Sequence, residues 1–283
     1  MSLNRPLRSM LYIPASKPRA LDKARNLPAD AIIFDIEDAV SVEEKETARD
    51  TLAAELATGG YGERYKIVRI NALDTAWGKA DATAVNAMQP DAILLPKVSS
   101  SAHLDTLADL TKAPIWAMME TPAGMLNAAQ IAAHPRLEGM VMGTNDLAKE
   151  LQTRFRPDRL PLQTGLGLCL LAAKAHGRAI VDGVYNAFKD NDGLALECEQ
   201  GRDMGFDGKT LIHPAQIDIT NKVFSPSAED IDLARRQIAA FEAAESTGQG
   251  VAVVDGRIVE NLHVVTARDI LAKAKAIAAM EAA

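Results

Sequence analysis

Aromatic residues and long apolar runs are scarce in this sequence. Phenylalanine, tryptophan and tyrosine make up only 4% of the 283 residues, so aliphatic side chains and alanine must form the core. No apolar run reaches the roughly 18 residues of a membrane-spanning helix. The N-terminal stretch "MSLNRPLRSM" lacks the apolar core of a signal peptide. We therefore expect a cytoplasmic protein with no membrane segment.

The sequence also lacks the signatures of several functional classes. Only two cysteines occur, Cys169 and Cys198, and neither belongs to a Cys-x-x-Cys pair, so we interpret them as reduced core thiols. The net charge is -7 and no basic cluster contains aromatic residues, which argues against nucleic-acid binding. There is no GxSxG or GxGxxG motif, so serine-hydrolase and dinucleotide-binding functions have no support.

What the sequence does contain is a series of short apolar runs, each followed by a helical pattern. Continuous aliphatic runs, rather than alternating ones, are typical of parallel strands that are buried on both faces. Eight such units in succession predict a (β/α)8 TIM barrel over residues 1–224, and a doubly wound open sheet is the alternative. The runs cover residues 9–15, 31–37, 66–71, 92–97, 115–121, 139–145, 179–185 and 206–214.

Residues 225–283 are not needed to close such a barrel. Ser227 and Asp230 stand at capping-box spacing, so we expect a helix that begins there and runs to Gly248. Two short β runs around Asp255-Gly256 then predict a hairpin, and an alanine- and lysine-rich helix follows it. This segment should form a C-terminal extension that is either packed in place or acts as a lid.

Polar and charged side chains follow the apolar runs, at the end where a barrel of this class carries its active site. Glu120 and Asp146 follow consecutive runs, and clustered carboxylates of this kind repel each other unless a cation lies between them. Oxygen ligands favour Mg²⁺ or Mn²⁺ over Zn²⁺. The alternatives are a helix N-terminal acid for Glu120 and a helix N-cap for Asp146. The residues at strand ends are Glu37, Asp38, Arg69, Asn71, Lys97, Glu120, Asn145, Asp146, Asp182 and His213.

The stretch "AIIFDIEDAV" places three carboxylates, Asp35, Glu37 and Asp38, within four residues after an apolar run. If the strand continues through them, Asp35 and Glu37 share one face and Asp38 lies on the other. Arg69 ends the next run, and its planar guanidinium suits a carboxylate or a developing enolate. The alternative for Arg69 is a buried partner for a structural acid, and Asp35 could be such an acid.

Seven stretches, in this order, resemble the citrate lyase β-subunit-like family. That family includes malyl-CoA and citramalyl-CoA lyases and malyl-CoA thioesterases, and the (3S)-malyl-CoA thioesterase branch looks most similar. The resemblance implies a TIM barrel, a Mg²⁺ cofactor, a CoA-thioester substrate and a homo-oligomer, either a trimer or a hexamer. The stretches are "SMLYIPASKPRALDKA", "ADAIIFDIEDAV", "IVRIN", "AILLPK", "METPAG", "GTNDLAKEL" and "LIHPAQI".

The resemblance also implies roles for individual residues. Glu120 and Asp146 match the metal ligands of the family, and Arg69 matches its substrate-binding arginine. Glu37 and Asp38 would act beside the metal by hydrogen-bonding the water bound to it.

The same motifs imply further contacts with the substrate. Lys17 and Lys23 match the basic residues that contact CoA, and we expect Tyr12 and Asn145 to contact the substrate. The lyases of the family carry an aspartate in a C-terminal hairpin-like segment as the group that transfers a proton, and here Glu260 takes that place. We expect the extension, residues 225–283, to form a lid over a neighbouring subunit, so that Glu260 serves the neighbour's site.

We therefore expect hydrolysis of (3S)-malyl-CoA to malate and CoA. The alternatives are carbon–carbon cleavage by a malyl-CoA or citramalyl-CoA lyase, and the citrate lyase β-subunit reaction on an acyl group held by a carrier protein. A non-catalytic binding protein on a barrel scaffold is a further alternative, and the presence of Glu120, Asp146 and Arg69 together argues against it.

Overall fold

The computed structural model describes residues 5–282, so residues 1–4 and 283 of the two expected domains lie outside the description. The described chain divides into two compact units, one spanning Leu7–Phe224 and the other containing residues 225–282. The first unit contains two buried apolar clusters and the second unit contains one of its own. Among residues 5–282, no helix is both long and apolar enough to cross a membrane.

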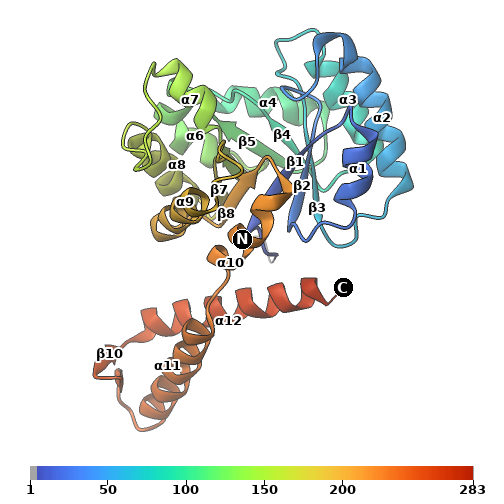
Figure 1. Cartoon of the computed structure of the whole chain (residues 1–283). Coiled ribbons are helices and arrows are strands. Elements are labelled where there is room, and N and C mark those ends of the chain that lie inside the picture. Colours follow the sequence, from blue (N-terminus) through green and yellow to red (C-terminus); the bar gives the residue numbers. More distant parts are fainter. Residues whose placement is uncertain (1–4, 283) are drawn as a thin grey trace. The chain divides into compact units, whose positions relative to one another are not determined.

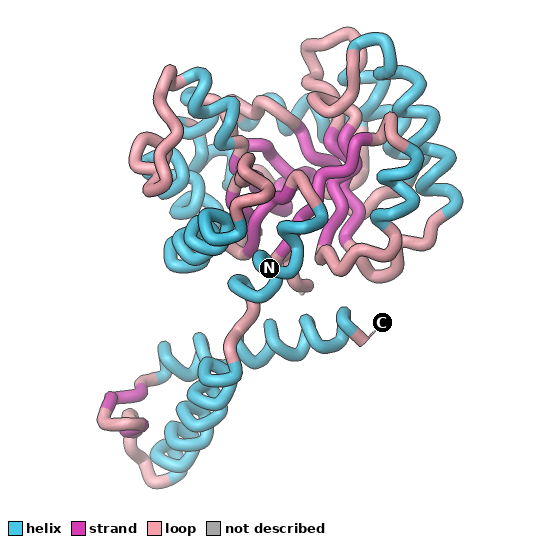
Figure 2. Tube along the Cα trace, viewed as in Figure 1, coloured by secondary structure: helices cyan, strands magenta, loops and turns pink. Residues whose placement is uncertain are grey.

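The first unit is a closed barrel of eight parallel strands that pair in chain order, with β8 returning to β1 (Figure 1). This confirms the predicted (β/α)8 architecture, and the alternative of an open sheet is wrong. Figure 2 shows the strands gathered in the centre of this unit with helices around them. The strands are β1 (Ser9–Pro14), β2 (Ala31–Asp35), β3 (Tyr65–Arg69), β4 (Ala92–Leu95), β5 (Ile115–Met119), β6 (Leu137–Met142), β7 (Ala179–Asp182) and β8 (Gly208–Leu211).

Helices fill the connections between the strands and follow β8, and a short 3-10 helix occurs after β2 and another after β8. The α-helices are α1 (Pro18–Ala24), α2 (Lys45–Thr58), α3 (Gly78–Met88), α4 (Ser101–Leu110), α5 (Pro122–Leu126), α6 (Ala128–Ala132), α7 (Thr144–Glu150), α8 (Gln163–Ala175), α9 (Asn191–Met204) and α10 (Ile217–Phe224). The 3-10 helices are η1 (Val42–Glu44) and η2 (Pro214–Gln216).

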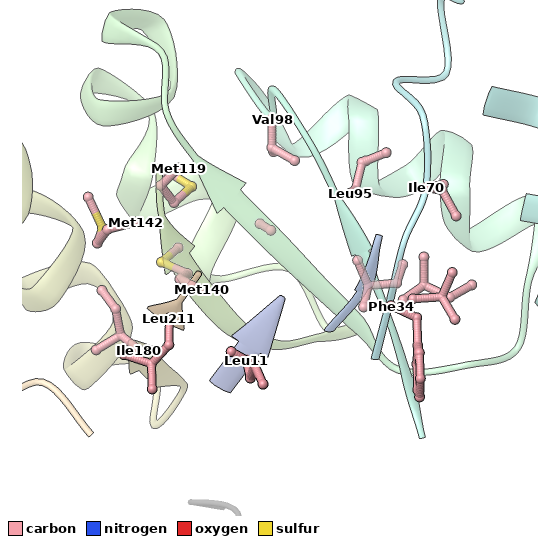
Figure 3. Packing of buried hydrophobic residues seen from close by; sticks show 14 of the residues in the cluster. Leu11, Phe34, Ile70, Leu95, Val98, Met119, Met140, Met142, Ile180 and Leu211 are labelled. Atoms are coloured by element: carbon pink, nitrogen blue, oxygen red, sulfur yellow. The ribbon is translucent and has the colours of Figure 1, made fainter. Parts of the chain in front are cut away.

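The barrel strands bury both of their faces, which explains their continuous apolar sequences. Alternate side chains such as Ile33, Ile67 and Trp116 form one cluster inside the barrel. The residues between them, such as Phe34 and Met140, pack outward against the helices in a second, larger cluster (Figure 3). This alternation decides which side chain at each strand end points into the barrel mouth.

The second unit consists of α11 (Ala228–Ser246), a hairpin of β9 (Ala252–Val254) and β10 (Arg257–Val259), and α12 (Asn261–Glu281). The predicted capping box is confirmed, because Ser227 Oγ accepts the Asp230 N–H and Asp230 Oδ2 accepts the Ser227 N–H. The hairpin is confirmed as well, with positive φ at Asp255 and Gly256 as a two-residue turn of this kind requires. Helix α11 ends before the predicted Gly248, whose φ of 78° is not helical.

Candidate active site

A pocket of about 300 Å³ opens at the carboxyl ends of the barrel strands. A wider hollow of about 570 Å³ lies on the surface between α8 and α9, away from the strand ends. The first pocket is lined by six residues that the sequence predicted for the site, namely Tyr12, Asp38, Arg69, Glu120, Asn145 and Asp146. The structure thus brings most of the predicted residues together.

The period of the strands explains why these side chains converge. Arg69 follows Tyr65 and Ile67 at two-residue spacing, and both of these lie in the cluster inside the barrel. Glu120 follows Trp116 and Met118 of the same cluster at the same spacing. Because alternate residues of a strand share a face, Arg69 and Glu120 both point into the barrel mouth.

Arg69 is held by a buried aspartate on the neighbouring strand. In the register of β2 and β3, Asp35 stands beside Arg69. Its Oδ1 accepts from Arg69 Nε at 2.8 Å and its Oδ2 accepts from Nη2 at 2.5 Å. The ring of Tyr12 lies 4.8 Å from the centre of the guanidinium. The alternative of a structural acid as partner for Arg69 is therefore correct, while Arg69 also lines the pocket.

The remaining guanidinium nitrogen of Arg69 faces the two acids of the turn after β2. Nη1 lies 3.0 Å from Glu37 Oε2 and 3.6 Å from Asp38 Oδ2. The prediction that Asp38 lies on the opposite face from Asp35 is wrong, because β2 ends at Asp35 and the turn brings Asp38 to the pocket. Glu37 does not line the pocket but lies directly behind Arg69.

Glu37 is buried, and burial raises its pKa to about 7, against the opposing effect of Arg69. Its Oε2 lies close to Arg69 but without hydrogen-bond alignment, so within the described residues this oxygen accepts no hydrogen bond. Tyr12 Oη is likewise buried and has no partner among the described residues. Both are thus buried polar atoms whose hydrogen-bonding capacity is unused within the described residues.

Glu120 is buried at the end of β5 and takes no part in capping a helix. The following helix is capped by Thr121, whose side chain accepts the Gly124 N–H, so Glu120 stands one residue before the N-cap of α5. Glu120 Oε1 instead accepts the backbone N–H of Lys97 at 2.7 Å. Lys97 presents that N–H from a left-handed backbone with a φ of 53°.

Asp146 is the third residue of α7, whose N-cap is Gly143, so the N-cap alternative for Asp146 is wrong. Among residues 5–282, the carboxylate of Asp146 has no ion pair or hydrogen bond. Burial raises the pKa of Glu120 to about 8, and the charges of Glu37 and Asp146 add to this effect against the Lys97 N–H. A Cβ on Gly143 would lie 2.6 Å from Glu120 Oε2, so this position leaves room for the carboxylate.

The donor set fits a hard divalent cation that shares its coordination with substrate and water. Among residues 5–282, no three His, Cys, Asp or Glu side chains lie close enough to hold a metal by themselves. Mg²⁺ typically takes only one or two carboxylates and keeps several water ligands. The two acids follow the adjacent strands β5 and β6, Glu120 directly after β5 and Asp146 in the first turn of α7. Oxygen donors of this kind, without a thiolate or an imidazole, match the preference of Mg²⁺ and disfavour Zn²⁺.

Three other predicted residues form contacts within the protein. Asn71 Nδ2 donates to the Ile36 carbonyl and to Asp81 Oδ2. His213 Nδ1 accepts the Ala215 N–H, and its ring stacks on Phe188 at 4.5 Å. Asn145 lines the pocket and exchanges two hydrogen bonds with the amide of Asn186.

Asp182 does not converge with the other acids, contrary to the prediction from its place at a strand end. It lies in phase with Ile180, which packs outward against the helices. Its carboxylate is fully buried between Arg159 Nη1, at 2.7 Å from Oδ2, and Lys209 Nζ, at 3.1 Å from the same atom. Lys209 also binds Glu197 of α9, so this network joins the barrel wall to that helix.

The predicted CoA contacts lie outside the pocket. Lys17 is exposed just before α1, with its Nζ 3.9 Å from Glu44 Oε2. Lys23 is exposed in the last turn of α1. Glu260 belongs to the second unit, where it is exposed at the N-cap of α12 and donates its backbone N–H to His263 Nδ1.

Sequence reasoning missed the groups that position the acids. The structural role of Asp35 is to orient Arg69, and its in-phase spacing after Ile33 is a signal for this in the sequence. The roles of the Lys97 backbone and of Gly143 depend on how neighbouring strands approach one another. The sequence carries no signal for them.

Comparison with known proteins agrees with this geometry. The model of the HpcH/HpaI aldolase/citrate lyase family matches residues 8–214. The sequence is 69% identical, over 98% of each chain, to a protein of Cereibacter sphaeroides named (3S)-malyl-CoA thioesterase. It is 34% identical to the citrate lyase subunit beta of Escherichia coli, over 96% of this chain and 94% of that one.

Solved structures give the same relationship. The structure of CitE from Mycobacterium tuberculosis in complex with magnesium, acetoacetate and coenzyme A superimposes with a TM-score of 0.83. It is 33% identical in sequence and covers 96% of this chain and 100% of its own. These similarities extend beyond the barrel to almost the full length of the chain.

Proposed function

The chain belongs to the HpcH/HpaI aldolase/citrate lyase family, and on this premise we propose that it hydrolyses (3S)-malyl-CoA to malate and CoA with Mg²⁺ as cofactor. One observation carries the proposal. Two carboxylates that follow adjacent strands, Glu120 after β5 and Asp146 in α7, share a pocket with an arginine whose orientation is fixed by a buried aspartate. The high identity to a (3S)-malyl-CoA thioesterase supports the choice of substrate.

Glu120 and Asp146 would hold the metal. When bound, Mg²⁺ supplies a Lewis acid that stabilises negative charge on substrate oxygens. The Lys97 N–H fixes one oxygen of Glu120, and the absence of a side chain at Gly143 leaves space beside the other. Asp146, which has no partner among residues 5–282, is available as the second ligand.

Arg69 would bind the acidic end of the substrate or its developing charge. Because Asp35 holds Nε and Nη2, the guanidinium keeps one orientation and needs no rearrangement when the substrate binds. Tyr12 Oη is a buried hydroxyl without a described partner, so it can donate to a substrate oxygen. Asn145 lines the other side of the pocket and can bind the substrate through its amide.

Glu37 and Asp38 would act on protons beside the metal. Glu37 Oε2 has no hydrogen-bond donor within the described residues, so it can accept a hydrogen bond from a water molecule. A carboxylate that accepts a proton from water assists attack on the thioester carbonyl. Asp38 is more exposed and lies on the same side of Arg69.

The proposal also covers the binding of CoA and the association of subunits. Lys17 and Lys23 would contact the phosphates of CoA, because both are exposed, one just before α1 and the other in its last turn. We further propose a homo-oligomer, a trimer or a hexamer, in which residues 225–283 cover a neighbouring subunit and Glu260 serves the neighbour's site. A CoA thioester as substrate and two buried free thiols support a cytoplasmic location.

Carbon–carbon cleavage is the second candidate, and the similarity to citrate lyase beta subunits favours it. The two reactions give different products, so one incubation separates them. The purified chain is mixed with malyl-CoA and Mg²⁺, and free thiol and glyoxylate are measured in parallel. Thiol without glyoxylate supports hydrolysis, whereas glyoxylate without thiol identifies a lyase. No reaction with any CoA ester would favour a citrate lyase subunit that needs partners, or a binding protein.

A further inference from the structure

A buried lysine lies directly behind the acidic turn that follows β2. Lys45 is only 7% exposed, and its Nζ donates to the carbonyl of Glu37 at 2.6 Å and to that of Ile36 at 3.3 Å. The ring of Trp77 lies 5.9 Å from the same nitrogen. Within residues 5–282, no carboxylate lies within ion-pair distance of this ammonium group.

This placement is costly for stability. A buried charge loses its hydration, and buried charges usually have a charged partner. Lys45 is also the first residue of α2, where the helix dipole disfavours a cation. An apolar side chain of similar length would avoid both costs. The ammonium group therefore needs an explanation in the local geometry.

Two other side chains, those of Asp35 and Asn71, also hold the turn at residues 36–39. The carboxylate of Asp35 accepts the N–H of Glu37 at 2.9 Å and that of Ala39 at 3.0 Å. Asn71 Nδ2 donates to the Ile36 carbonyl at 2.9 Å. These bonds fix the N–H groups of the turn and one of its carbonyls.

The bond from Lys45 to the Glu37 carbonyl is the shortest of these contacts, and it reaches the residue whose side chain lies against Arg69. The same carbonyl accepts the N–H of Val40, which closes the turn. Lys45 itself does not line the pocket. Its effect on the site must therefore pass through the backbone of residues 36–39.

We propose that Lys45 is a positioning residue whose ammonium group fixes the turn at residues 36–39 and thereby keeps Glu37 and Asp38 beside Arg69. Small displacements of groups that act on a reaction lower its rate strongly, even where binding of the substrate changes little. The expected effect on rate rests on the proposed function. The geometry of the turn does not, and it can be measured separately.

The test compares wild type with Lys45→Met, which keeps the length of the side chain but removes the charge, and with Lys45→Arg, which keeps the charge. Lys174→Met, at an exposed lysine of α8 that pairs with Asp207, is the matched control. Each protein is assayed for malyl-CoA hydrolysis, for its melting temperature, and for hydrogen exchange of peptides covering residues 31–40. For Lys45→Met we expect kcat to fall by about tenfold or more with KM changed by less than about twofold.

Hydrogen exchange distinguishes a local effect on the turn at residues 36–39 from a general loss of stability. In Lys45→Met, exchange should accelerate at the amides of residues 36–40 while β2 stays protected, and Lys45→Arg should recover part of both losses. Wild-type kcat and exchange in Lys45→Met would overturn the inference. So would faster exchange spread over the whole barrel, because that indicates general destabilisation. If wild type does not hydrolyse malyl-CoA, the proposed function fails, and exchange alone then decides the role of Lys45.

Discussion

At the scale of single residues, the site depends on charges whose orientation is fixed before any ligand arrives. Asp35 holds Arg69 through two hydrogen bonds, and the Lys97 N–H holds Glu120. Such preorganised groups need not rearrange during the reaction, which is the main source of electrostatic catalysis. The sequence placed Arg69 and Glu120 at strand ends, but not the groups that orient them.

We expect activity to depend on Gly143 as strongly as on a charged residue of the site. A Cβ at this position would lie 2.4 Å from Glu120 Cβ and 2.6 Å from Glu120 Oε2, so Gly143→Ala must displace the carboxylate. We expect kcat/KM for malyl-CoA to fall by about tenfold or more, with a loss of stability of about 1–3 kcal/mol from overpacking. Steady-state kinetics and thermal unfolding measure the two effects.

Gly167→Ala is the control for that substitution. Gly167 lies within α8, and a Cβ there would meet no atom within 4 Å. Because alanine is favoured over glycine in a helix, this variant should gain about 0.5–1 kcal/mol and keep full activity. Equal activity in Gly143→Ala and Gly167→Ala would show that the space beside Glu120 is not needed.

At the scale of elements, α1 should bind CoA without taking part in the reaction. Lys17→Ala and Lys23→Ala should raise KM for malyl-CoA, because each removes a phosphate contact. Turnover of a minimal thioester, such as an N-acetylcysteamine analogue, should stay nearly unchanged, because phosphate contacts are remote from the reacting carbon. Lys79→Ala, at an exposed lysine of α3, is the control. An equal loss on both substrates would rule out a role in phosphate binding.

The network that joins β7 and β8 to α9 should make stability depend on pH. Burial alone would raise the pKa of Asp182, but Lys209 and Arg159 outweigh it and lower the pKa. The ionised carboxylate therefore stabilises the fold above its unfolded pKa of about 3.9, and this contribution is lost as pH falls through the lower pKa of the folded state. At pH 7 we expect Asp182→Asn to lose about 3 kcal/mol, because it leaves buried cations unpaired.

Urea unfolding of wild type and Asp182→Asn between pH 7 and pH 3 measures this effect. The difference in free energy of unfolding between the two proteins should shrink at acid pH. Asp232→Asn, at an exposed aspartate paired with Arg236, should change stability by less than about 0.5 kcal/mol throughout. A difference for Asp182→Asn that is constant over the whole range would contradict the account.

Comparison of individual elements shows which structural features the sequence predicts and which it does not. The barrel, the hairpin at Asp255-Gly256 and the capping box at Ser227 were predictable because each depends on local pattern or turn chemistry. Asp38 and Asp182 were misplaced because their positions depend on where a strand stops and on which face its last residue lies. The burial and the role of Lys45 cannot be predicted from the sequence, since a lysine at the start of a helix is ordinarily solvated.

At the scale of the whole molecule, Glu260 should act on the site of a neighbouring subunit. Two inactive variants, Glu120→Gln and Glu260→Gln, would each lack one part of the shared site. Co-expressed as mixed trimers, they should rebuild roughly a quarter of all sites, by counting over closed rotational interfaces. Activity well above that of either parent supports the shared site. If mixed oligomers are confirmed by mass and stay inactive, Glu260 acts within its own chain or not at all.

The central claim is that Glu120 and Asp146 hold the metal on which the reaction depends. Glu120→Gln and Asp146→Asn each remove a charged ligand and preserve shape, so both should fold with a melting temperature near that of wild type. Glu150→Gln, at an exposed acid at the end of the same helix as Asp146, is the control and should bind metal as wild type does.

The most direct test measures Mn²⁺ binding and malyl-CoA hydrolysis on the same metal-stripped samples. After treatment with EDTA, wild type should be inactive, and it should recover with Mg²⁺ or Mn²⁺ as one ion binds per chain. The Glu120→Gln and Asp146→Asn variants should neither bind the ion nor recover. Full activity in the metal-stripped wild type, or metal binding in both variants equal to that of wild type, would contradict the account.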